Sequence, residues 1–127
     1  MNKKVMKKWV KALLSGKYKQ GQGLLKQTDH KNTIRHCCLG VLCELYNEDM
    51  KEKKKKKLTE KVDGFGVIRF NQQAEHLPNI VKDWADLSDT VGSVGSIGPF
   101  DSLATLNDDG KTFKTIAKTI EKEWENL

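Results

Sequence analysis

The sequence has no long apolar stretch. Nowhere do about 18 apolar residues follow one another, the length that a helix needs to cross a bilayer, so neither a membrane-spanning segment nor a membrane partner is expected. Residues 1–14 mix lysines with apolar residues instead of forming an uncharged apolar run, so no signal peptide is expected. The 127 residues fit one domain, 1–127, and a chain of this length can bury roughly two thirds of its unfolded surface.

The chain has few cysteines, and their spacing argues against the usual roles of paired thiols. Cys37, Cys38 and Cys43 are odd in number and crowded together, so we expect reduced thiols and no disulfide framework. No Cys-x2-Cys pair is present, and adjacent cysteines in a helix point to different faces, so we expect no metal site. Cysteine is among the most frequently buried residues, which favours a core position for Cys38 and Cys43.

Motifs for nucleotide and nucleic-acid binding are also absent. The glycines match neither a P-loop nor a dinucleotide-binding fingerprint, and no helix-turn-helix or zinc finger stands out. The formal net charge of +6 still favours an anionic partner. Much of that charge lies in the first helix and in the lysine-rich run 51–57, which we interpret as an exposed loop. Nucleic acid is therefore not the expected ligand.

Apolar residues at helical spacing predict three longer helices. The first covers 5–14, and the second, 37–50, is apolar enough to lie at the centre of the domain. Gly40 is costly inside the second helix unless another backbone packs closely against it. The last helix begins at the N-cap Thr112. Its expected core residues are Phe113, Ile116, Ala117, Ile120 and Trp124.

A small antiparallel sheet is predicted between these helices. Asp63-Gly64 separates two β-prone stretches, 58–62 and 65–70, and such a pair is a strong hairpin signal. Residues 33–35 can add a short strand after the polar turn 28–33. The sequence thus predicts strands that are local and short.

A short helix and a glycine-rich loop complete the prediction. Leu77-Pro78 opens a helix that runs to Leu87. Residues 88–99, rich in glycine and serine, are expected to form a flexible loop that can act as a lid. The predicted fold is α+β, with three longer helices, one short helix and a small antiparallel sheet.

Two sequence blocks carry a resemblance. Residues 9–23 read W-x-x-A-L-x-S-G-x-Y-x-Q-G-x-G, and residues 37–43 read C-C-L-G-V-L-C. With 77–78, 84–87 and 103–117, they resemble a widespread family of uncharacterised bacteriophage and prophage proteins. The resemblance implies the cytoplasm of an infected bacterial host as the setting, and it brings no activity with it.

The residues most suited to receive a ligand are polar or lie in irregular backbone. Residues 18–23 can expose backbone amides, and residues 35–36 lead into a helix N-terminus, which suits an anion. The chain has two arginines against 21 lysines, and arginine is the side chain suited to bidentate phosphate recognition. Residues 107–110 are expected to form a tight turn before the last helix. The expected ligand-binding residues are Tyr18, Gln20, Gly21, Gly23, Arg35, His36, Arg69, Asn107 and Asp108.

These residues lead us to expect a binding protein rather than an enzyme, with no catalytic residues and no cofactor. The predicted function is counter-defence, in which a small anionic, nucleotide-derived immune signal is sequestered without turnover, by a protein expected to form a homo-oligomer. Two alternatives stay open. One is a protein-binding inhibitor whose lysine-rich face meets a host defence factor. The other is a cysteine hydrolase in which Cys37 is the nucleophile and His30 or His76 its base.

Overall fold

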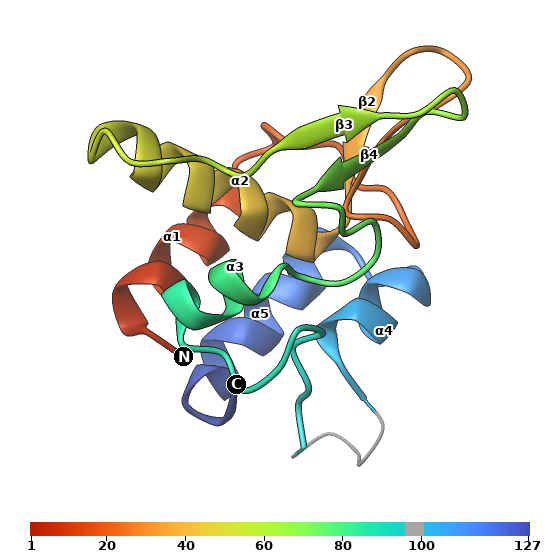
Figure 1. The fold of residues 1–127 in the computed structure, drawn as a ribbon. Helices are drawn as coiled ribbons and strands as arrows, with labels where there is room; N and C mark the ends of the chain where they lie inside the picture. Colours follow the sequence, from red (N-terminus) through yellow and green to blue (C-terminus); the bar gives the residue numbers. More distant parts are fainter. Residues whose placement is uncertain (96–100) are drawn as a thin grey trace.

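The structure, a computed structural model, describes residues 1–95 and 101–127. It places a group of helices on one side and a sheet that projects away from them (Figure 1). The helices are α1 (Lys3–Leu14), α2 (Cys38–Glu52), α3 (Asn79–Ala85), α4 (Leu103–Asp108) and α5 (Phe113–Glu123), with a 3-10 turn at Trp124–Asn126. The strands are β1 (Lys26–Thr28), β2 (Ile34–His36), β3 (Glu60–Val62) and β4 (Val67–Phe70). The α+β prediction is confirmed.

The helix α1 forms as its apolar spacing predicts. The side chain of Asn2 caps it by accepting a hydrogen bond from the backbone N–H of Val5 at 3.0 Å. Trp9 lies on the buried face, is fully buried, and donates from Nε1 to the carbonyl oxygen of Cys38 at 2.9 Å. This face packs against α5 and α2.

The central helix α2 is buried along most of its length. A Cβ atom at Gly40 would overlap the backbone carbonyl of Leu25, so the chain before β1 crosses α2 at this glycine. The expectation that Gly40 marks a close backbone approach is confirmed.

The four strands form one antiparallel sheet in the order β2-β1-β4-β3. The predicted hairpin around Asp63-Gly64 joins β3 to β4. The registers place His36, Lys26 and Ile68 in one row, on the face toward α2. The next residues, Arg35 and Gln27, point to the opposite face because side chains alternate along a strand.

One strand was not predicted, and two local predictions were wrong. Residues 26–28 form the strand β1, which received no strand prediction because these polar residues lack an apolar alternation of their own. Residues 107–108 end the helix α4 instead of forming a turn, since Ser102 caps that helix by accepting from the N–H of Thr105. Lys51 and Glu52 belong to the last turn of α2, so the exposed loop begins at Lys53.

The expected lid also differs in the part that the structure describes, 88–95. Asp89 accepts hydrogen bonds from the N–H groups of Val91 and Ser93, both at 3.1 Å. Val94 is fully buried, and Ser93 forms a β-bridge with Ser102. Residues 88–95 are therefore anchored to the rest of the domain. The remainder of the predicted loop, 96–99, lies outside the described residues.

The last helix follows its prediction with one exception. Thr112 caps α5 by accepting from the N–H of Thr115, and the apolar face from Phe113 to Ile120 is buried. Trp124 is half-buried and begins the 3-10 turn.

Candidate functional site

Gln20 and Asn107, two of the predicted ligand-binding residues, are joined in a hydrogen-bond network inside the fold. Asn107 is fully buried, and its Oδ1 accepts from Gln20 Nε2 at 3.1 Å and from the N–H of Cys38 at 3.0 Å. Asn107 Nδ2 donates to the carbonyl oxygen of Gly21 at 2.8 Å. Gln20 Oε1 accepts from the N–H of Phe113 at 3.0 Å. Gln20 and Asn107 thus accept hydrogen bonds from N–H groups at the starts of α2 and α5 and link both helices to the irregular segment 18–23.

Gly23 and Asp108 belong to the same region. The N–H of Gly23 donates to Asp108 Oδ1 at 2.8 Å. Gly21 is buried, and a Cβ there would come within 2.9 Å of side-chain atoms of Arg35 and Gln27. The structure therefore brings Gln20, Gly21, Gly23, Asn107 and Asp108 together, but their polar groups bond to one another.

The two arginines are each paired within the sheet. Arg35 Nε donates to Asp29 Oδ2 at 2.9 Å, and Arg69 Nη1 donates to Asp63 Oδ2 at 3.0 Å. The hydrogen bond from Arg35 lowers the pKa of Asp29 to about 2. Both arginines lie on the sheet face away from His36. The predicted ligand-binding residues Arg35 and Arg69 therefore do not lie on one face with His36, because side chains alternate along a strand.

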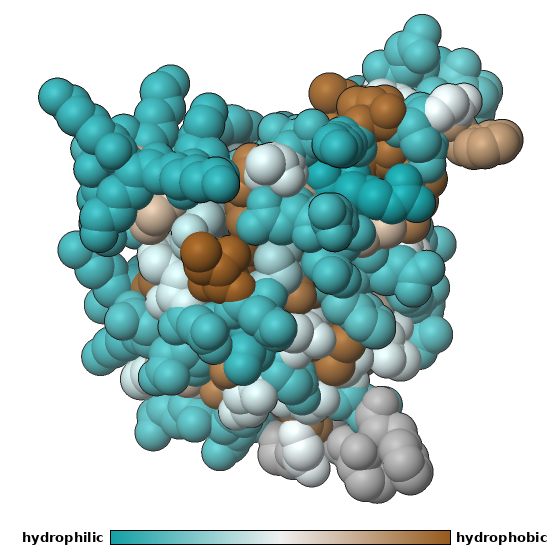
Figure 2. All heavy atoms as spheres, viewed as in Figure 1, coloured by the Kyte–Doolittle hydropathy of each residue, from teal (hydrophilic) through white to brown (hydrophobic). Residues whose placement is uncertain are grey.

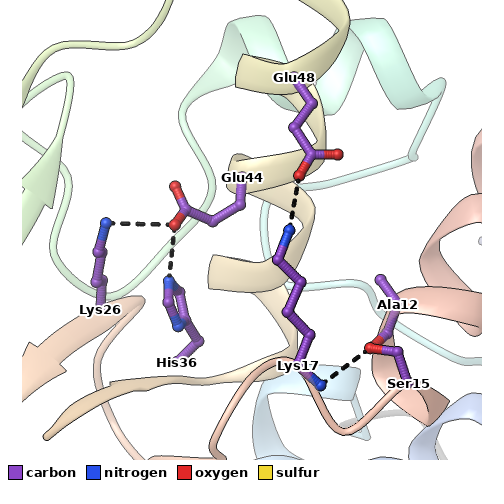
Figure 3. A network of polar contacts seen from close by, with 7 residues as sticks. All are labelled: Ala12, Ser15, Lys17, Lys26, His36, Glu44 and Glu48. Atoms are coloured by element: carbon purple, nitrogen blue, oxygen red, sulfur yellow. Dashed lines mark hydrogen bonds and ion pairs between the residues drawn. The ribbon is translucent and has the colours of Figure 1, made fainter.

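A cluster of charged side chains surrounds Glu44 of α2, where the helix meets the sheet face that carries His36 and Lys26 (Figure 3). Glu44 Oε2 lies 3.1 Å from His36 Nε2 and 3.2 Å from Lys26 Nζ, and Lys26 also lies 2.6 Å from Glu60 Oε1. Burial acts to raise the pKa of Glu44, but the hydrogen bond from His36 and the charge of Lys26 outweigh it and lower the pKa. The cluster therefore holds an ionised carboxylate between two nitrogen groups.

One atom of this cluster is not satisfied. The side chain of His36 is 5% exposed, and its Nδ1 is buried without a hydrogen-bond partner in the described part of the chain. The rings of Tyr18 and His36 pack in a T-shaped pair, with ring centroids 5.2 Å apart and an angle of 81° between the ring planes. A buried polar atom without a partner costs about 1–3 kcal/mol, so this nitrogen needs an explanation.

A cavity of about 470 Å³ adjoins Tyr18 and His36, and we call it the Tyr18 cavity. Its volume is in the range of small-molecule sites. Lys17 pairs with Glu48 at 3.3 Å, whereas no partner is found for the side chain of Lys19 within the described residues. The cavity is lined by Lys17, Tyr18, Lys19, Lys26, Asn32, Thr33, Ile34, His36 and Glu44.

Sequence reasoning found two residues of this cavity, Tyr18 and His36, and missed its lysines. Lys17 and Lys19 directly flank Tyr18 in the sequence, so their positions were available as a signal. Lys26 was hidden because β1 was not predicted, and only the strand register places it beside His36.

The cysteines are not activated. Cys37 is 4% exposed, and burial raises the pKa of its thiol to about 11. Cys38 and Cys43 are fully buried, and burial raises the pKa of each well above its ordinary value. Among residues 1–95 and 101–127, no three His, Cys, Asp or Glu side chains are grouped to hold a metal ion.

Comparisons with known proteins give a family but no activity. Within the described ranges, none of the helices has the length and apolar character needed to span a bilayer. No curated protein and no solved structure matches the chain. A family model matches residues 1–124, nearly the whole sequence, and the chain therefore belongs to the family described as Domain of unknown function (DUF8296).

Proposed function

We propose that this protein binds a small anionic, nucleotide-derived ligand in the Tyr18 cavity and holds it without turnover. The observation that carries the proposal is a cavity of about 470 Å³ whose wall presents Lys17, Lys19 and Lys26 beside an aromatic ring. Lysine ammonium groups bind phosphate as point charges, and an aromatic face offers stacking area to a base.

The lysines of the cavity differ in how free they are to meet a ligand. Lys26 is held by Glu44 and Glu60, so it contributes charge from a fixed position. The Lys17–Glu48 pair is exposed on both sides, at 65% and 54%, and such pairs contribute little stability. A phosphate group can therefore take the place of Glu48 beside Lys17, and Lys19 can turn toward the same anion.

Tyr18 adds a hydrogen-bond donor. Burial, together with the charge of Glu48, raises the pKa of its hydroxyl, so the group stays protonated at neutral pH. A protonated phenol donates to a phosphate oxygen.

Holding the ligand intact fits the state of the thiols. A cysteine nucleophile needs a lowered pKa and access to substrate, whereas Cys37 is buried with a raised pKa. The wider role that we propose, in line with the resemblance, is counter-defence in an infected bacterial cell, where a stoichiometric binder removes a nucleotide signal.

The test is ligand retention. Protein purified under native conditions is incubated with cyclic and ADP-ribose-type nucleotides, and the complex is weighed by native mass spectrometry before and after denaturation. We expect one nucleotide to be retained and released unchanged. Lys19→Ala should weaken retention about tenfold, the loss of one charge-assisted contact. Lys118→Ala, an exposed lysine on α5, is the matched control and should bind as wild type. Absence of retention across the whole panel would contradict the proposal.

A second candidate, a protein-binding inhibitor, is favoured by the projecting hairpin. Phe65 at its tip is 93% exposed, and Val62 and Ile34 are also exposed on the sheet. Figure 2 shows apolar surface on this projecting sheet, next to hydrophilic surface. Exposed aromatic side chains are common anchors at protein interfaces, and the exposed lysines 53–57 suit an acidic partner.

Phe65→Ser separates the two candidates. The change should leave the free energy of unfolding within about 0.5 kcal/mol because the side chain is exposed, and nucleotide retention should not change. Inhibition of a host defence factor, measured with the purified factor, would be lost only if the hairpin is the binding surface.

A further inference from the structure

We propose that the Tyr18 cavity selects an anion that also carries a hydrogen-bond donor, such as the hydroxyl of a ribose phosphate, because His36, one of its lining residues, has a buried acceptor, Nδ1, that no described residue satisfies. The inference rests on the proposed function and names the chemistry of its ligand. It starts from the atom that the fold leaves without a partner.

The contacts of Glu44 determine which nitrogen of His36 carries the proton. Glu44 Oε2 lies 3.2 Å from the Lys26 ammonium and 3.1 Å from His36 Nε2. An ammonium group at that distance keeps the carboxylate ionised, and an ionised carboxylate only accepts hydrogen bonds. His36 Nε2 therefore donates to Glu44. In the neutral imidazole this leaves a bare lone pair at Nδ1.

The orientation of the ring is fixed as well. A flip of the imidazole would take Nε2 away from Glu44 and place a carbon there, so it would lose a hydrogen bond to an ionised group. Tyr18 packs against the ring in a T-shaped pair. The backbone of His36 is also held, since its N–H donates to the carbonyl of Lys19 and its carbonyl accepts from the N–H of Gly21. The acceptor at Nδ1 therefore stays in place.

This acceptor discriminates between anions of similar size. A fully ionised phosphate monoester has only acceptor oxygens, so it satisfies the lysines of the cavity and not Nδ1. A hydroxyl group close to the phosphate donates to Nδ1 while the phosphate meets Lys17 and Lys19. Because Nδ1 is buried, the proposal requires the half-buried ring of Tyr18, which packs against the imidazole, to shift when the ligand binds. A site with a buried hydrogen-bonding group rejects analogues that lack its partner.

The experiment compares two matched probes on the full chain. The first is ribose 5-phosphate, and the second is tetrahydrofurfuryl phosphate, the same ring without hydroxyl groups. Both are titrated into 15N-histidine-labelled protein at about pH 8, where the phosphate is fully ionised. We expect ribose 5-phosphate to bind about tenfold more tightly or better. It should also move the Nδ1 resonance of His36 toward that of a hydrogen-bonded acceptor, and the second probe should leave it unchanged.

Two glutamates on α2 supply the variant and its control. Glu44→Gln removes the ionised partner, so His36 can place its proton on either nitrogen. The ratio of the affinities for the two probes should therefore fall toward 1. Glu48→Gln changes a residue one turn away that pairs with Lys17 and not with His36, so the preference should remain. If Glu44→Gln does not fold, the affinities of the wild type for the two probes and its Nδ1 resonance still show whether the ligand donates to Nδ1.

The outcomes separate this inference from the proposed function. Equal affinity for the two probes, with Nδ1 unmoved, overturns the selection of a donor while anion binding stands. Binding of neither probe at millimolar concentration overturns this inference, whereas the proposed function is overturned only by the absence of retention across the nucleotide panel. A preference for ribose 5-phosphate that persists unchanged in Glu44→Gln overturns the role of His36.

Discussion

At the scale of single residues, Gly40 has the clearest consequence. Any side chain at this position would overlap the carbonyl of Leu25, which is backbone and cannot move aside cheaply. We expect Gly40→Ala to lower the free energy of unfolding by about 1–3 kcal/mol, the range for overpacking a core. Gly64→Ala is the control, because a Cβ there meets open space, and it should stay within about 0.5 kcal/mol. Denaturant unfolding measures both, and equal effects would contradict the close approach.

Asn107 is a second residue with a sharp expectation. Its truncation removes the partners of Cys38 N–H, Gly21 C=O and Gln20 in a buried place. Asn107→Ala should therefore cost about 2–4 kcal/mol, since unsatisfied buried groups cost about 1–3 kcal/mol each and relax in part. Asn79→Ala, an exposed asparagine at the start of α3, should have little effect. Thermal and denaturant unfolding of both variants check the difference, and a mild effect at Asn107 would show that its network is dispensable.

Glu44 links the stability of the fold to pH. Although burial opposes it, the hydrogen bond from His36 and the charge of Lys26 lower the pKa of this carboxyl. A group whose pKa is lowered by folding stabilises the protein above its unfolded pKa, and this contribution is lost as pH falls through the folded value. The stability difference between wild type and Glu44→Gln should therefore be largest near neutral pH and shrink from about pH 5 downward. Unfolding in denaturant at several pH values measures it. The exposed Glu125→Gln should show no such trend, and a pH-independent difference at Glu44 would contradict the prediction.

At the scale of elements, the three thiols of α2 and its N-cap residue are inaccessible to solvent. Cys37, Cys38 and Cys43 are buried and their pKa values are raised by burial. Iodoacetamide should therefore label native protein slowly at neutral pH, and the rate should rise when denaturant opens the fold. Ser15→Cys, placed at an exposed helix end, gives the rate of a free thiol. Fast labelling of native Cys37, seen by mass spectrometry, would contradict this prediction and favour the cysteine hydrolase alternative.

The elements also show which patterns in the sequence were sufficient. The helices α1, α2 and α5 follow from apolar spacing, and α5 also from its N-cap Thr112, because burial on one face leaves a strong periodic signal. The strand β1 has no such signal. Its residues 26–28 are half-buried and polar, and they become a strand because β2 and β4 pair with them on both sides. Pairing between distant segments is a tertiary event, and local propensity does not report it.

At the scale of the whole molecule, the net charge of +6 acts separately from the cavity. The exposed lysines 53–57 should attract any polyanion, in a way that weakens as salt rises. Replacing these five lysines by serine should lower binding to a non-specific DNA duplex severalfold and flatten its salt dependence. Retention of the small ligand should be unchanged, since the Tyr18 cavity does not include them. Fluorescence anisotropy measures the first effect and native mass spectrometry the second. An equal loss of DNA binding and of ligand retention would show that the electrostatic field of the whole protein, and not the Tyr18 cavity, supplies the affinity for the ligand.

The candidate site was predicted in part. Tyr18 and His36 were named from local features, an irregular segment and a helix N-terminus, and the structure places both at one cavity. Arg35 and Arg69 were named for their chemistry, but each is paired with an aspartate on the other face of the sheet. Chemistry identifies a side chain that suits a ligand. The strand register decides the face on which it lies.

The sequence by itself determined the α+β class, the three longer helices and the hairpin, because each follows from periodicity or turn chemistry within a few residues. Only the tertiary structure decided that Gln20 and Asn107 bond to each other, and that Lys26 and Glu44 meet at His36. The physical reason is distance along the chain. These partners come from separate elements, and their encounter depends on how the sheet packs against α2.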